Sequence, residues 1–229
     1  MATNFDDILA DFDNQVNPNN RLTLTKLKRQ DLQLLQTVWI NERMAPELLT
    51  YEHELIERIL SRLRDQVEFI ELNSIDIQNT DKDIKLKLVV IESELGRVNF
   101  LLRSYLRTRL SKIDRLTVFI RTSDEFIQRL SEEETIYMEN HFKSLVQLYN
   151  NLFLNTMPEQ LQSLDDESGG ISMIEQPDWN KPVFIRVVND IKESIIVGDE
   201  EVELEKEGIY LLRYSAVKNF VHNRDVVLI

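Results

Sequence analysis

Residues 102–113 read LRSYLRTRLSKI, and this stretch lies within a long run of helical apolar spacing. Apolar side chains recur at steps of three and four from Leu88 to Tyr105, and the seam then shifts to Leu106, Leu110 and Ile113. This spacing places them along one face of an α-helix. The pattern predicts a helix over residues 83–121, long enough to pack against several partners.

The same stretch is the basic part of an acidic chain. Residues 97–121 hold seven basic side chains and one acidic one, whereas the net charge of the 229 residues is −13. Three interpretations stay open: the arginines form salt bridges within a helical bundle, bind acidic or carbonyl groups of partner subunits, or bind DNA. The acidic balance of the whole chain argues against DNA binding that is independent of sequence.

Outward from this stretch, other helices and then strands are predicted. Amphipathic spacing predicts helices over residues 23–44 and 51–72, and Ser131 with Glu134 form a capping-box pair at the start of a fourth helix that extends to about residue 155. Short β-branched runs predict strands at 183–188, 194–197, 209–214 and 226–229, with a short helix over 215–222. The acidic residues between 199 and 207 are expected in a solvated hairpin or sheet edge.

These elements predict an α+β chain, with an N-terminal all-helical bundle domain followed by a small β-rich C-terminal domain. We expect a disordered tail over residues 1–20, a helical domain over 21–164, a linker over 165–181 and the β-rich domain over 182–229. Glycines and prolines become frequent only near the linker and beyond it. Gly96 lies inside the long helix and favours a local bend there.

Composition and motifs argue against several classes of protein. The chain has no cysteine, and it shows neither a secretory signal nor an apolar run long enough to span a membrane, which favours an intracellular protein. Its histidines, His53, His141 and His222, lie on separate elements without the spacing of metal ligands. Phosphate-binding loops and nucleophile elbows are absent. We therefore expect no enzyme activity, no metal and no cofactor.

The N-terminal tail contains a short amphipathic pattern. Phe5, Ile8, Leu9 and Phe12 follow helical spacing, and acidic residues occupy the first turn. A helix this short is not stable by itself, so we expect it to form in the groove of a partner. The alternative is that the tail docks on its own domain.

Six blocks in order along the chain resemble the Sld5 subunit of the eukaryotic GINS complex: WINERMAPELL at 39–49, LRSYLR at 102–107 continuing to KID at 112–114, MPE at 157–159, PDW at 177–179, VF at 183–184 and the terminal VLI at 227–229. The resemblance implies a non-catalytic subunit of a nuclear heterotetramer with three Psf subunits. It also implies that this heterotetramer joins the minichromosome maintenance ring and Cdc45 to form the replicative helicase, which acts in initiation and elongation of DNA replication.

The resemblance further implies roles for particular residues. Candidates for the helical-domain core or for subunit contacts are Trp39, Glu42, Pro46, Arg103, Tyr105, Arg107 and Lys112. The tail resembles the short motif with which fungal members bind the Ctf4 hub, and the matching residues are Asp6, Asp7, Ile8, Leu9 and Phe12. The alternative function is an independent helical adaptor that binds nucleic acid through the basic helix at 97–121, and direct contact with DNA stays open.

Overall fold

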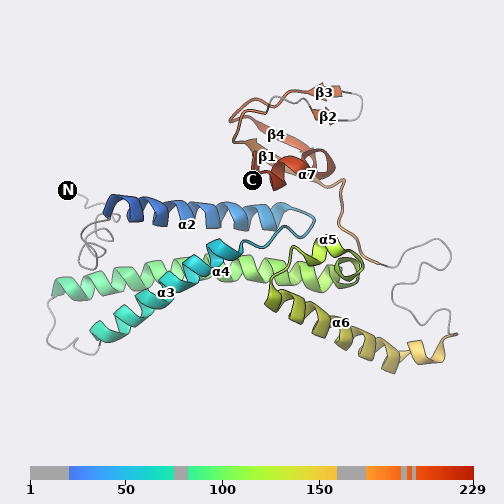
Figure 1. The fold of residues 1–229 in the computed structure, drawn as a ribbon, viewed down its shortest axis with the longest axis horizontal. Coiled ribbons are helices and arrows are strands. Elements are labelled where there is room, and N and C mark those ends of the chain that lie inside the picture. The colour runs from blue at the N-terminus through green and yellow to red at the C-terminus, as the bar shows by residue number, and fades with distance from the viewer. Residues whose placement is uncertain (1–20, 75–81, 159–173, 192–194, 198–199) are drawn as a thin grey trace. The chain divides into compact units, whose positions relative to one another are not determined.

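The computed structural model describes residues 21–74, 82–158, 174–191, 195–197 and 200–229. The N-terminal tail, in which a hub-binding motif is predicted, lies outside the described residues. Helices come first and a small sheet follows, which confirms the predicted α+β class (Figure 1). The helices are α2 (Arg21–Met44), α3 (His53–Ser74), α4 (Lys82–Thr122), α5 (Asp124–Ile127), α6 (Glu132–Leu152) and α7 (Tyr214–His222), with a 3-10 turn η1 (Leu154–Thr156). The strands are β1 (Pro182–Val187), β2 (Ile195–Val197), β3 (Glu200–Val202), β4 (Ile209–Arg213) and β5 (Val226–Leu228).

The chain forms two compact units. The first contains Met1–Trp39 and Glu52–Ser104, and the second contains Ile40–Tyr51 and Tyr105–Ile229. In the first unit, α2, α3 and the N-terminal part of α4 bury the apolar faces that the sequence pattern predicts. Its buried side chains are Leu35 on α2, Leu55, Ile56, Ile59 and Leu63 on α3, and Leu88, Ile91, Leu101 and Leu102 on α4.

Helix α4 departs from helical geometry at Leu116, which has φ −103° and ψ 16°. The bend predicted at Gly96 is wrong, because the residue of α4 that leaves helical φ and ψ is Leu116 and not Gly96. Thr117 explains the break. Its hydroxyl donates to the carbonyl oxygens of Ile113, at 2.5 Å, and Asp114, at 3.2 Å. A threonine that bonds back to the preceding turn competes with the helix ladder and bends it.

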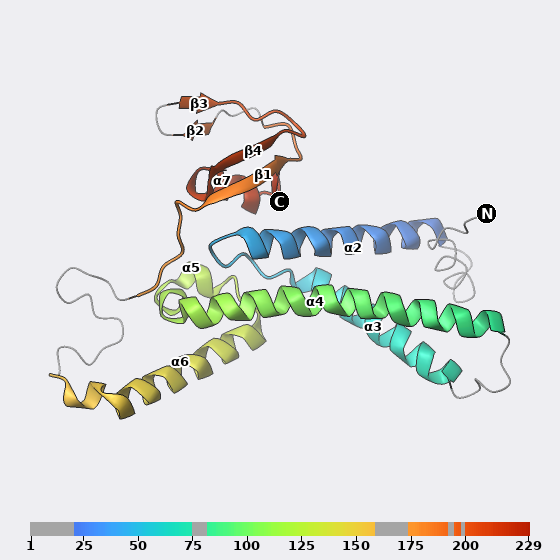
Figure 2. The same cartoon turned by 180° about the vertical axis from the view of Figure 1, so that it is seen from behind.

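The C-terminal sheet has the antiparallel order β4-β1-β5, and a separate hairpin pairs β2 with β3. Val183, Ile185 and Val187 of β1 are buried, and the residues between them are exposed. The buried face of the sheet packs against α7, which contributes Val217 and Val221 to the same core. Both views place α7 on one side of β1 and β4 (Figures 1 and 2).

The helical part of the second unit has its own core, formed by Leu48, Ile113, Leu116, Ile120, Phe126 and Met138. Helix α6 begins with the predicted capping box: the Ser131 hydroxyl accepts the N–H of Glu134, and the Glu134 carboxylate accepts the N–H of Ser131. That prediction is confirmed. The short helix α5 was not predicted, because four residues are too few to show a period.

Candidate functional site

The last turn of α2 and the buried segment after it supply the first part of the site. The helix ends at Met44, and the residues around this end are enclosed although several are charged. The side chain of Glu42 is 1% exposed, and that of Glu47 is fully buried. Asn41 accepts the backbone N–H of Leu228 through its Oδ1 atom at 2.8 Å, which joins this segment to β5. Carboxylates are rarely buried unless they are paired with cations.

Arg109 of α4 is the central cation and is fully buried. Its Nε and Nη2 atoms donate to the two carboxylate oxygens of Glu134 at 2.7 and 2.8 Å. Its Nη1 atom donates to Glu42 at 3.0 Å and to the carbonyl of Leu49 at 2.7 Å, and Nη2 also donates to the carbonyl of Arg129 at 3.0 Å. A guanidinium has five N–H groups, and these contacts use all five.

Two tyrosine rings cover this guanidinium. Its carbon atom lies 5.2 Å from the ring centroid of Tyr51 and 5.8 Å from that of Tyr105. Burial by itself lowers the pKa of Arg109, but the hydrogen bonds that Arg109 donates to Glu134 and the charge of Glu42 outweigh it and raise that pKa. Arg109 is therefore a permanent charge held inside the protein.

Lys112 lies one turn further along α4 and shares Glu42 with Arg109. Its ammonium group donates to the Glu42 carboxylate at 2.7 Å and to the carbonyl oxygens of Glu42 and Glu47, the latter at 2.6 Å. Burial disfavours the charged form more than Glu42 favours it, so the pKa of Lys112 is lowered.

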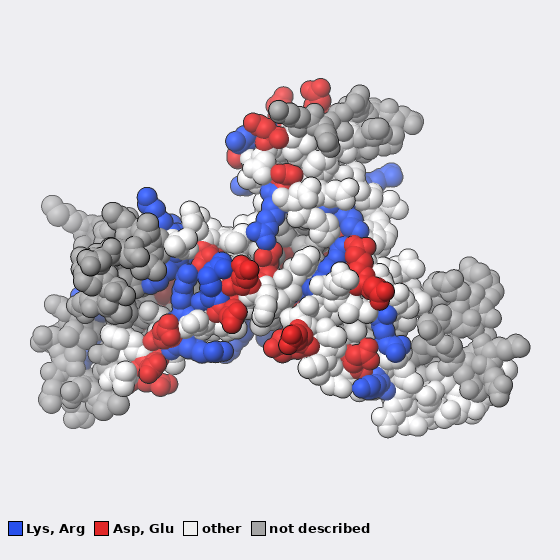
Figure 3. Space-filling view, in the orientation of Figure 1, with Lys and Arg blue, Asp and Glu red and all other residues white. Residues whose placement is uncertain are grey.

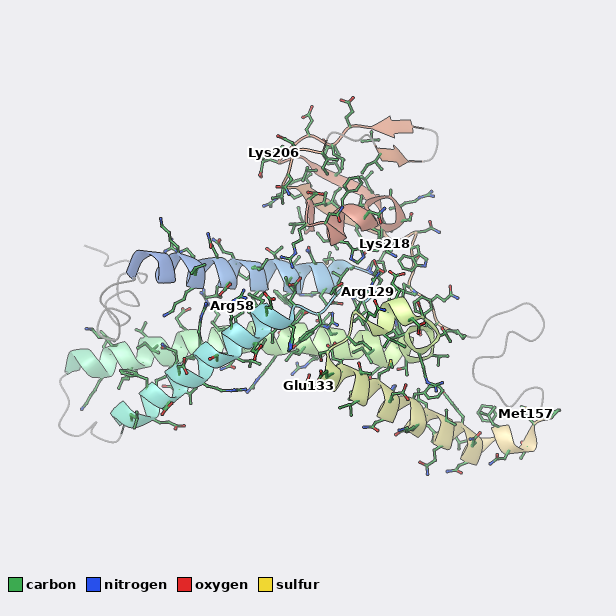
Figure 4. All side chains as sticks on the ribbon, viewed as in Figure 1. Arg58, Arg129, Glu133, Met157, Lys206 and Lys218 are labelled. Atoms are coloured by element: carbon green, nitrogen blue, oxygen red, sulfur yellow. The ribbon has the colours of Figure 1, made fainter. Side chains whose placement is uncertain are left out.

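Glu47 joins the N-terminal helices to α7, which packs on the C-terminal sheet. It accepts the Tyr214 hydroxyl at 2.6 Å, Nε2 of His222 at 3.1 Å and Nη1 of Arg129 at 2.8 Å, and Lys218 lies 3.5 Å away. Figure 4 labels Arg129 near α5 and Lys218 on α7. Burial raises the pKa of Glu47, but the hydrogen bonds from His222 and Tyr214 and the charge of Arg129 outweigh it and lower the pKa to about 2.

The buried charges balance. Arg109, Lys112 and Arg129 carry the positive charge, and Glu42, Glu47 and Glu134 carry the negative charge. We call these six residues the ionic network. Its groups are satisfied by one another and by backbone carbonyls rather than directed at an open cavity. Such an arrangement fixes the relative positions of α4, α5, α6 and the segment after α2, and through Glu47 it also holds α7.

The first unit has a smaller ionic cluster, in which a buried carboxylate is paired with two partly exposed arginines. Asp31 of α2 accepts from Arg58 at 3.1 Å and pairs with Arg62 at 2.7 Å (Figure 4). Burial raises the pKa of Asp31, but the two arginines outweigh it and lower that pKa. Acidic and basic side chains are interspersed over the α2–α3 region in the face that Figure 3 displays. On that face the charges neutralise one another locally.

The seven residues that the resemblance indicated occupy different environments in the structure. Glu42 and Lys112 belong to the ionic network, Tyr105 covers Arg109, and Pro46 is buried beside Glu47. Trp39 is half-buried, whereas Arg103 and Arg107 are exposed. Sequence reasoning did not select Arg109 from its neighbours and missed Glu47, Arg129, Tyr214 and His222 as site residues. The sequence signal that could have drawn attention to Glu47 is that it is the acidic residue of an otherwise apolar stretch after α2, APELL at 45–49.

The basic stretch at 97–121 is largely neutralised by its neighbours. Arg97 pairs with Glu94 at 3.0 Å, Arg115 with Glu175 at 2.8 Å and Arg121 with Glu139 at 3.4 Å, while Arg109 and Lys112 are in the ionic network. For Arg103 and Arg107 no ion pair forms with the part of the chain that the structure describes. Most of the predicted basic surface is therefore engaged within the chain.

Within the part of the chain that the structure describes, no group of three or more histidine or carboxylate side chains could hold a metal ion. Among the described helices, none combines the length and apolarity needed to cross a bilayer.

Comparison with known proteins places the chain in a family. Residues 50–153 match the model of the GINS complex protein helical bundle domain, and residues 177–229 match that of the DNA replication complex GINS protein SLD5 C-terminus. The chain belongs to the SLD5 family. The two SLD5 matches cover most of the elements that contribute to the ionic network, and the segment at residues 40–49 precedes the first of them.

Curated SLD5 proteins resemble the chain over nearly its whole length. The DNA replication complex GINS protein SLD5 of Debaryomyces hansenii is 41% identical, with 98% of this chain and 97% of the relative covered. The SLD5 protein of Yarrowia lipolytica is 40% identical, with 97% of this chain and 85% of the relative covered. That of Saccharomyces cerevisiae is 34% identical, with 92% of this chain and 84% of the relative covered. The resemblance inferred from the six sequence blocks is confirmed.

Proposed function

We propose that this chain is a non-catalytic structural subunit of the GINS heterotetramer, assembled with three Psf subunits in the nucleus. The supporting observation is the ionic network in a chain of the SLD5 family. Buried, mutually satisfied charges cannot turn over a substrate, but they hold helices and the C-terminal sheet in a fixed arrangement that partners can recognise. As an extension of this role, GINS joins the minichromosome maintenance ring and Cdc45 in the replicative helicase during initiation and elongation.

The test is co-expression with the three Psf subunits, followed by size-exclusion chromatography with light scattering. We expect one species with a 1:1:1:1 mass, and we expect the chain expressed alone to be less soluble because its partner-facing surfaces stay uncovered. A soluble monomer that elutes apart from the other subunits would contradict the proposal.

The alternative, a nucleic-acid adaptor, receives little support from the geometry. This alternative needs the basic side chains of residues 97–121 to be available to DNA, but Arg109 is fully buried. Five of the seven basic residues in this stretch have carboxylate partners at 2.7 to 3.4 Å. Too few free cations remain on this helix to release many counterions from a phosphate backbone.

We also propose that the tail links GINS to the Ctf4 hub through Asp6, Asp7, Ile8, Leu9 and Phe12. The aspartates would favour the first helical turn, and the apolar residues would fill a groove. Replacing Ile8→Ala together with Leu9→Ala is expected to abolish hub binding and leave the tetramer intact, because the tail makes no part of the proposed subunit core. Titrating the peptide of residues 2–14 and its double variant against the hub measures this, and equal affinities would contradict it.

A further inference from the structure

The outward face of the C-terminal sheet is apolar, and its side chains are exposed among the residues that the structure describes. Strand register places Leu211 of β4 opposite Phe184 of β1, and the backbone N–H of Ile229 donates to the carbonyl of Phe184 at 3.0 Å on the other side. These three side chains therefore form one row across the sheet. Leu211 is 55% exposed, Phe184 51% and Ile229 41%.

The next row has the same character with one charge added. Ile209 of β4 and Val227 of β5 flank Arg186 of β1, and Ile209 is 60% exposed. The opposite face of the same strands is buried against α7, so the sheet is apolar on both sides. Antiparallel sheets with one solvated face normally alternate apolar and polar residues. A sheet with two apolar faces is the middle layer of a three-layer arrangement. Among the described residues, α7 supplies one outer layer, and the other face of the sheet is left exposed.

Charge on this face indicates what covers it. The described outward positions of β4, β1 and β5 carry Arg186 and Arg213 and no acidic side chain, in a chain whose net charge is −13. Lys181 precedes β1 beside Arg213, whereas Glu207 and Asp225 lie at the opposite end of the strands. The occupant must therefore combine apolar side chains with carboxylates, and the carboxylates belong at the end near Arg213.

We propose that the outward face of β4-β1-β5 docks an acidic amphipathic helix of another GINS subunit. This inference rests on the proposed function. A helix is the element that covers the inner face, and one apolar stripe of a second helix matches the row formed by Leu211, Phe184 and Ile229. A second copy of this chain would bring like-charged arginines together. Permanent subunits, rather than transient partners, cover faces this apolar.

The absence of cysteine allows a direct test by thiol labelling. A maleimide is used to label the single variant Leu211→Cys in the free chain and in the assembled complex. The control is Lys206→Cys, on the exposed loop before β4 (Figure 4 labels Lys206). We expect the Leu211→Cys thiol to react at least about tenfold more slowly in the complex and the control thiol to change less than about twofold. Equal rates at position 211 in a complex that assembles would overturn the docking proposal, whereas failure to assemble would count against the proposed function instead.

A second experiment tests the charge of the occupant. Arg186→Lys keeps the positive charge and introduces an amine that a carbodiimide can couple to a nearby carboxylate. We expect a crosslink from this amine to an aspartate or glutamate of another GINS subunit, and we expect Arg186→Glu to restore fast labelling in the Leu211→Cys background. Crosslinks only to carboxylates of this chain, or unchanged protection with Arg186→Glu, would overturn the proposal.

Discussion

Replacing Arg109→Met is expected to lower the free energy of unfolding of the second unit by about 3 to 5 kcal/mol, because it leaves the buried carboxylate of Glu134 without its cation and Glu42 with Lys112 alone. The methionine fills much of the space, so the loss reports charge and hydrogen bonding rather than a cavity. Glu134 loses both bonds of its bidentate pair, and the carbonyl oxygen of Leu49 loses the Arg109 donor. The carbonyl oxygen of Arg129 keeps only the backbone N–H of Tyr51. The stability of Arg109→Lys should lie between that of the parent chain and that of Arg109→Met, because an ammonium keeps the charge but has three donors in place of five.

Arg107→Met is the matched control. Arg107 lies on the same helix, two residues away, and is exposed without a carboxylate partner among the described residues. We expect its effect to stay within about 0.5 kcal/mol. Urea unfolding followed by Trp179 fluorescence, in a Trp39→Phe background, measures both variants, since Trp179 stacks on Tyr214 at 6.4 Å and belongs to the core beside the network. Equal urea midpoints for the two methionine variants would contradict the central role of Arg109.

The second large effect is a loss of stability in acid that depends on Glu47. Its pKa is about 2 in the folded protein, against a reference value of 4.5 for an unperturbed glutamate. Because the folded pKa is the lower one, the unfolded chain binds the proton more tightly. The stabilisation is therefore complete above about pH 4.5 and is lost as the pH falls toward 2. The difference corresponds to about 3 kcal/mol.

Comparing the parent chain with Glu47→Gln isolates this contribution from other titrating carboxyl groups. At pH 7 the variant should be less stable, since Arg129 then lacks its buried anion, and between pH 4.5 and 2 its stability should fall less steeply than that of the parent. Glu203→Gln is the control because Glu203 is exposed. Urea midpoints measured at several pH values decide the matter: parallel pH profiles for the parent and Glu47→Gln would show that Glu47 is not the group responsible.

Much of the fold follows from local patterns. Predicted helix ends differ from the observed ones by about two residues for α2, α3 and α4, and the strand at 226–229 closes the sheet as β5 (Val226–Leu228). The helix expected to reach residue 155 instead ends at Leu152 and is followed by η1. These elements were predictable because apolar periodicity is a property of neighbouring residues, which set which face can be buried. The capping box at Ser131 is local for the same reason.

The bend in α4 shows where local reasoning fails. Glycine has a lower helix propensity than alanine, which favoured a bend at Gly96, but the cost is only about 1 kcal/mol and the helix absorbs it. The break at Leu116 depends on a threonine hydroxyl bonding back to the preceding turn while Leu116 itself is held in the core. That combination involves residues brought together from α4, α5 and α6.

The sequence by itself determined the helices, the strands, the α+β class and, through six short blocks, membership of the SLD5 family. It could not distinguish Arg109 from Arg107, which have the same side chain on the same helix. Only the tertiary structure decided that Arg109 is buried between Glu42 and Glu134 and that Arg107 is exposed. It also decided that Glu47 meets Tyr214, 167 residues away along the chain. Pairing of buried charges depends on which distant residues share a space from which water is excluded, and periodicity carries no record of that.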